Sequence, residues 1–139
     1  MKALHQVSRD YAGLAGQGKF TPFGLSIALG AEVSNVILAT CQLLDARGAP
    51  IKVANVPILF WVSANTAGDY ALGVNLTGMT IPTYGQRYAV LIANTSIAGV
   101  TNLNGIVEVR LYLIVTSSRR LCAMLPGGTI VQSEPVVFA

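Results

Sequence analysis

Short hydrophobic runs, separated by Gly, Asn, Thr and Pro, follow one another from Phe23 to the C-terminus. The run 58–62 is apolar at every position, which predicts a strand with both faces covered. The run 106–116 alternates apolar with polar positions, a period of two that is typical of a strand with one buried face. Its apolar positions are Val107, Val109, Leu111, Leu113 and Val115.

Turn residues separate several of these runs. Asp45 and Gly48 stand at the first and fourth positions of a predicted type I turn. Pro126-Gly127-Gly128 has the composition of a hairpin turn, because proline presets φ and glycine accepts positive φ. Loops are expected at 66–69 and 78–86, and a loop or an edge strand is expected at 94–105.

The pattern predicts roughly eight short strands and no stretch long enough for an amphipathic helix. This spacing favours an all-β fold, a two-layer β-sandwich, over residues 23–139. Residues 1–22 have no clear period and are rich in glycine, so we predict an extended N-terminal arm that becomes ordered on a partner. The segments with strand character are 24–29, 33–44, 51–53, 58–62, 70–76, 87–93, 106–116, 120–125, 129–132 and 136–139.

The chain carries little charge for its hydrophobicity. Of its 139 residues 11% are charged and 53% are hydrophobic, yet no apolar run approaches the roughly 18 residues that a membrane helix requires. We therefore expect no association with a membrane. A chain with so few charges is expected to cover part of its surface with neighbours, which predicts a subunit that works inside an assembly.

Nine basic residues against six acidic ones give a formal net charge of +3. The basic residues are scattered along the chain, so no stripe predicts specific nucleic-acid binding. The only adjacent basic pair is Arg119-Arg120. We interpret it as part of a solvated loop or of an ion pair at a contact, in preference to a phosphate clamp.

Residues that would carry catalysis or hold a metal are scarce. His5 is the only histidine and lies in the arm, so a Ser/His/Asp, Cys/His or His-metal site would depend on a residue outside the domain. No phosphate-binding glycine motif occurs. We therefore predict no enzymatic activity and no catalytic, cofactor-binding or metal-binding residues. The acidic residues are isolated in the sequence: Asp10, Glu32, Asp45, Asp69, Glu108 and Glu134.

Cys41, Trp61 and Cys122 follow the order in which immunoglobulin domains place a disulfide and the tryptophan packed on it. The two cysteines are farther apart than is usual there. Cys122 also shares its parity with Arg120 and Met124, whereas its sequence neighbours on either side form the cleaner apolar face. We favour two free, buried thiols over a disulfide, as expected for a chain made in the cytoplasm. The bridged alternative stays open at this point.

Lys2 is followed from His5 onward by polar residues instead of a continuous apolar segment, so we expect no cleaved signal peptide. With no lipidation motif either, the sequence predicts synthesis in the cytoplasm, wherever the protein resides afterwards.

The segment 39–51, with its Asp45-to-Gly48 turn, followed by Ile58-Leu59-Phe60-Trp61-Val62-Ser63, resembles bacterial-type immunoglobulin-like modules. Together with four further segments it resembles a group of small tailed-phage virion proteins that carry one such domain. The likeness covers residues 23–139 and leaves the arm unmatched. The low charge departs from the usual pattern of that group. The further segments are 30–37, 105–109 with 120–130, and 136–139.

The resemblance implies an immunoglobulin-like β-sandwich in a non-enzymatic virion protein, one that decorates or cements the outside of a phage capsid. It implies the major capsid protein as partner, and we expect a homo-oligomer. One alternative is a receptor- or carbohydrate-binding module in which Tyr70, Tyr84 or Tyr88 stacks on sugars. Another is a structural component of the tail or neck. Head or tail location, symmetry and host are left open by the sequence.

Overall fold

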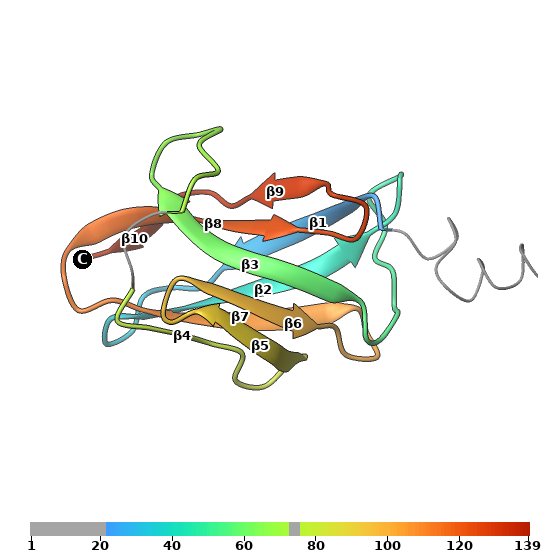
Figure 1. Cartoon of the computed structure of the whole chain (residues 1–139), viewed down its shortest axis with the longest axis horizontal. Helices are drawn as coiled ribbons and strands as arrows, with labels where there is room; N and C mark the ends of the chain where they lie inside the picture. The colour runs from blue at the N-terminus through green and yellow to red at the C-terminus, as the bar shows by residue number, and fades with distance from the viewer. Residues whose placement is uncertain (1–21, 73–75) are drawn as a thin grey trace, which may run out of the picture.

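The computed structural model describes residues 22–72 and 76–139, and within them the chain is all-β and contains no helix (Figure 1). No helical segment in these two ranges could therefore cross a bilayer. The strands are β1 (Gly24–Leu29), β2 (Val36–Leu44), β3 (Pro57–Ala64), β4 (Gly78–Thr80), β5 (Gln86–Ile92), β6 (Ser96–Val100), β7 (Ile106–Tyr112), β8 (Ser117–Met124), β9 (Ile130–Gln132) and β10 (Val136–Phe138).

The strands form two antiparallel sheets that pack face to face as a sandwich (Figure 1). One sheet has the order β1-β2-β7-β4, and the other has the order β10-β8-β3-β6-β5 with β9 also paired to β8. The predicted two-layer β-sandwich is confirmed. The first sheet reproduces the A-B-E-D adjacency of an immunoglobulin domain, and β8-β3-β6-β5 corresponds to F-C-C′-C″. The chain order differs from that pattern, because the strand in the D position precedes the C′ and C″ strands.

The core lies between the inner faces of the two sheets, where alternate residues of each strand point. Phe60 of β3 and Phe138 of β10 are the largest side chains with no exposed surface. The strand β3 is covered on both sides, as its unbroken apolar run predicts, because Trp61 and Ser63 on its outer face are buried too. Residues of the other strands that complete the core include Ile37, Cys41, Leu43, Val107, Val109, Leu111, Leu121 and Ala123.

The turn at Asp45–Gly48 forms as predicted. The backbone N–H of Gly48 donates to the carbonyl of Asp45 at 3.0 Å, and the carboxylate of Asp45 accepts from the N–H groups of Arg47 and Ala49 at 2.8 and 2.9 Å. These backbone donors, that of Ala49 first, lower the pKa of Asp45 because they stabilise its charged form.

The predicted strand 33–44 begins only at Val36. Ser34 and Asn35 have φ of 52° and 67°, and Val33 and Val36 bond to each other in both directions across them. Positive φ at both central residues defines a type I′ hairpin turn, which asparagine tolerates and which the hydrophobic pattern hides.

Two other predicted strands are not formed by the described residues, and a third is shorter than predicted. The segment 51–53 is not a strand: the N–H of Ile51 bonds the carbonyl of Leu43 at 2.9 Å, but its carbonyl accepts from the side chain of Gln42 instead of a strand ladder. Residues 70–72 and 76 are not in a strand, and the rest of the predicted strand 70–76 lies outside the described residues. Strand character also ends at Tyr112, short of the predicted Thr116.

Two strands differ from the predictions for their segments. Residues 78–80, predicted as a loop, form β4, which pairs with the end of β7. Residues 96–100, predicted as part of a loop or an edge, form β6 in the interior of the second sheet, between β3 and β5. Glycine is rare in strands, so Gly99 conceals β6 from an analysis of strand propensity. A Cβ at Gly99 would overlap the terminal methyl group of Ile81, which would have to move. The predicted arm, residues 1–22, lies outside the described residues except for Pro22, so it stays a prediction.

Gly105 joins the turn 101–105 to β2, and replacing it is expected to destabilise the fold. Its φ is +72°, and a Cβ would overlap the carbonyl oxygen of Ile51. We expect Gly105→Ala to lower the free energy of unfolding by about 3 kcal/mol in urea denaturation. The control is Gly48→Ala, which has φ +83° and open space around the Cβ, and should cost only about 1 kcal/mol. Equal losses would contradict the steric argument.

Candidate functional site

The turn 33–36, the loop 113–116 and β10 lie at one end of the sandwich, on the left in Figure 1. Each carries exposed aliphatic side chains, namely Val33, Ile114, Val115 and Val137, whose exposed fractions run from 56% to 68%. We call these four residues the apolar end. Solvated loop tips usually carry polar residues, so a group of this kind indicates a contact surface.

Hydrogen bonds between loops hold the segments of the apolar end together. The N–H of Leu113 donates to the carbonyl of Asn35 at 3.1 Å, which brings the 113–116 loop beside the type I′ turn. The N–H of Ala139 donates to the carboxylate of Glu32 at 3.0 Å, so the C-terminus lies next to the same turn. The N–H of Ile114 donates to the hydroxyl of Thr77, the residue before β4, at 3.3 Å.

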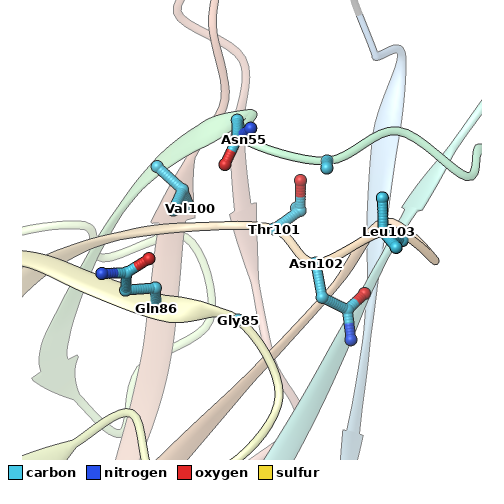
Figure 2. A pocket seen from close by; sticks show the side chains of 8 residues that line it. Asn55, Gly85, Gln86, Val100, Thr101, Asn102 and Leu103 are labelled. Atoms are coloured by element: carbon cyan, nitrogen blue, oxygen red, sulfur yellow. The ribbon is translucent and has the colours of Figure 1, made fainter.

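The opposite end holds an open hollow of about 330 Å³ that is lined without any charged residue (Figure 2). Asn55, Gln86 and Asn102 reach its wall from three separate segments, and Leu103 lies at its rim. The carbonyl of the Asn102 side chain is used within its own turn, where it accepts from the N–H of Asn104 and of Ile106. Asn55 and Gln86 make no side-chain hydrogen bond to a described residue, so their carboxamides are open to a neutral polar ligand.

The tyrosines proposed for sugar binding do not gather in one place. Tyr84 is half exposed and precedes Gly85, which lines the hollow. Its carbonyl accepts a hydrogen bond from the N–H of Glu108 in β7 of the first sheet. Tyr70 is in the loop 65–72, which lies over the outer face of the second sheet, and its carbonyl accepts from the indole N–H of Trp61 at 2.7 Å. Tyr88 is part of β5. Tyr70 and Tyr84 therefore belong to different loops with different partners.

Cys122 and Trp61 lie side by side on the outer face of the second sheet, under the loop 65–72. The carboxamide of Gln132 fastens this loop: it accepts from the N–H of Gly68 at 2.9 Å and donates to the carbonyl of Asp69 at 2.9 Å. It also lies 3.8 Å from the Cys122 sulfur. This packing explains why the second sheet buries side chains on both faces near Trp61.

The two cysteines are free and buried, as favoured by the sequence. Cys41 points into the core while Cys122 points to the outer face, so the sheet itself separates the thiols and the immunoglobulin-type bridge cannot form. Burial raises the pKa of Cys41 to about 12, and burial is also the main cause that raises the pKa of Cys122. Both are neutral thiols at physiological pH, which makes them poor nucleophiles.

The pKa of Cys41 predicts a loss of stability at alkaline pH. In the unfolded chain the thiol ionises near its ordinary value of 9.0, whereas the folded protein keeps it protonated to about 12. The stabilisation is therefore present below pH 9 and lost as pH rises from 9 to 12. We expect the wild type to lose about 2–3 kcal/mol of unfolding free energy relative to Cys41→Ala between pH 8 and pH 11 in urea titrations. A pH-independent difference would contradict the assignment.

Arg119 and Arg120 are ordered in β8 and not in a solvated loop. Arg119 is opposite Ala64 and Val136, while Arg120 is opposite Ser63, so successive residues of the strand place the two side chains on opposite faces of the sheet. A shared phosphate clamp is thereby excluded. Arg119 donates to the hydroxyl of Ser117 and to the carbonyl of Ser118, and Arg120 donates to the carbonyl of Ser133. Neither arginine has a carboxylate partner among the described residues.

No group of three or more His, Cys, Asp and Glu that could hold a metal occurs in residues 22–72 and 76–139. His5 lies outside the described residues. The absence of enzymatic activity and of cofactors stays a prediction.

No family model and no curated protein matches this sequence. Among solved structures, a crystal structure of the human F-spondin reeler domain is similar with a TM-score of 0.55 at 9% identity, covering 86% of this chain and 91% of that one. A second crystal structure of that domain has a TM-score of 0.48 at 11% identity and 83% coverage of both chains. The archaellum periplasmic stator protein FlaG from Sulfolobus acidocaldarius has a TM-score of 0.40 at 15% identity, covering 79% and 96%. The first likeness supports the β-sandwich fold, and the chain is of that class.

Proposed function

We propose that this chain is a non-enzymatic structural subunit that binds its neighbours through apolar surfaces. The observation that carries the proposal is the apolar end, where four aliphatic side chains from three segments lie exposed together. Burying a fully exposed aliphatic side chain contributes about 1.5–3 kcal/mol, and these side chains are already partly buried. The apolar end therefore supplies part of the free energy of a contact, and the surrounding surface must supply the rest to exceed the cost of association. Ile114 and Val115 lie adjacent in one loop and form its centre.

The assembly that we propose is the outside of a tailed-phage head, with the major capsid protein as partner. Support comes from the sequence resemblance of residues 23–139 to small virion proteins and from the low charge of the chain. The β-sandwich fold suits such a subunit, because it presents loops at two ends while its core holds them rigid. A tail or neck position would use the same surfaces and differ in copy number.

Charges placed in the apolar end are expected to remove the protein from particles. Ile114→Asp and Val115→Asp should each lower occupancy roughly tenfold or more, because a carboxylate would be desolvated in the contact. The copy number per shell protein is measured by quantitative mass spectrometry of purified particles. The control is Leu103→Asp, which changes an 81% exposed leucine at the opposite end and should leave occupancy unchanged.

Unchanged occupancy of the Ile114 and Val115 variants would contradict the role of the apolar end. Complete absence of the wild-type chain from particles would contradict the virion setting, whereas a handful of copies would place it in the tail or neck.

The hollow favours a second function, the binding of a neutral polyhydroxyl ligand such as a glycan. Carboxamides can donate to and accept from hydroxyl groups at once, and two of the three here have no partner among the described residues.

For this second function we expect Gln86→Ala to weaken binding to any neutral glycan found on an array by roughly tenfold, because one bidentate contact is lost. The matched control Asn65→Ala removes an exposed carboxamide from a different loop and should change nothing. No binding by the wild type to any glycan would exclude this function.

A further inference from the structure

The strand β5 forms an open edge of the second sheet and carries three consecutive exposed aliphatic residues. Val90, Leu91 and Ile92 are 47%, 54% and 44% exposed. Its only strand partner among the described residues is β6, so backbone N–H and C=O groups along its other side have no ladder to join. An exposed hydrophobic edge of this kind is a template for pairing with another strand.

The other sheet edges differ from β5. At β1 no large aliphatic residue is exposed, β4 is three residues long with Met79 buried, and β10 exposes only Val137 between two buried residues. The register of β5 shifts twice, and such bulges twist an edge away from neighbours. The strand nevertheless lacks lysine and proline, and residues 88–107 contain no charged residue.

The aliphatic residues of β5 are exposed on both faces of the sheet. Val90 is opposite Ile97, whose side chain belongs to the inner face, whereas Ile92 is opposite Ser96, which shares the outer face with Trp61. A partner packed flat on one face would cover only one of these two side chains. A strand added along the edge would bring neighbours to both, so the distribution indicates edge pairing.

We propose that β5 pairs with β5 of a second copy, antiparallel and about a twofold axis near Val90, which joins the two sheets of six strands into one. This inference rests on the proposed function as an assembly subunit and names the contact between copies. Such a register places Val90 opposite Val90 and Ala89 opposite Leu91, so aliphatic residues meet aliphatic residues. It places Arg87 beside the uncharged end of the partner strand, away from its own copy.

A second copy fits this edge better than a foreign strand. Twofold pairing uses the same edge of both chains, so the closed dimer leaves no further hydrophobic edge open. The absence of charge across residues 88–107 also suits a partner that is equally uncharged, and the chain supplies one in itself.

The test is sedimentation velocity of the isolated full chain over a wide concentration range. We expect a concentration-dependent dimer that Leu91→Lys weakens roughly tenfold or more, because each added ammonium group would lie opposite Ala89 of the other copy and replace an apolar contact. The matched control Leu38→Lys adds the same charge to an exposed leucine of β2, on the outer face of the first sheet, and should leave the dimer intact. Thermal melting verifies that both variants are folded.

Disulfide cross-linking tests whether the twofold axis lies near Val90. Residues directly opposite in an antiparallel pair have Cα atoms roughly 4.5–5.5 Å apart, within the range of a disulfide. Val90→Cys should therefore form a disulfide-linked dimer under mild oxidation, and Leu38→Cys, on the outer face of the first sheet, should not. The native thiols do not interfere, since both are buried.

A wild-type monomer at all concentrations, or a dimer that Leu91→Lys leaves unchanged, would overturn the β5 pairing. Particle occupancy separates this outcome from the proposed function. A monomer that still occupies particles refutes only the pairing, whereas a dimer that never occupies particles refutes only the assembly role.

Discussion

The packing of the two inner sheet faces against each other is the interaction on which the rest of this molecule depends. It buries the aromatic rings of Phe60 and Phe138 and the aliphatic residues of β2 and β7 in one continuous core. Because side chains alternate along a strand, this packing also decides which residues remain outside. The outward positions of Trp61 and Cys122 follow from it directly, since their sequence neighbours take the inner positions.

The core also sets the two ends of the sandwich apart. Antiparallel strands bring turns together at each end of the sandwich, so loops distant in the sequence become neighbours there. One end gathers exposed aliphatic residues and the other gathers carboxamides around an open hollow. The difference has a physical consequence: the first end favours contact with another apolar surface, and the second favours exchange of hydrogen bonds with a polar ligand or water.

Low charge has a structural counterpart in the edges of the sheets. Many β-proteins protect edges with charged side chains or proline, whereas β5 has neither in its aliphatic half. The outer face of the second sheet near Trp61 is covered by the loop 65–72, which the Gln132 carboxamide holds through hydrogen bonds. The chain therefore covers this face itself, whereas no described residue pairs with the free side of β5. A subunit that functions among neighbours is compatible with this arrangement.

Alternation, turn residues and composition were sufficient to predict the all-β sandwich, the Asp45 turn, the doubly covered β3 and two free thiols, because these depend on local chemistry and on the parity of side chains. They missed β4 and β6, and they extended a strand through Val33. Glycine has a low β propensity, yet Gly99 lies in β6, where it packs against the side chain of Ile81, which is distant in the sequence. The apolar end and the hollow depend on loops from several parts of the chain meeting at one place. Only the packing of the two sheets brings these loops together, so no sequence period could reveal either surface.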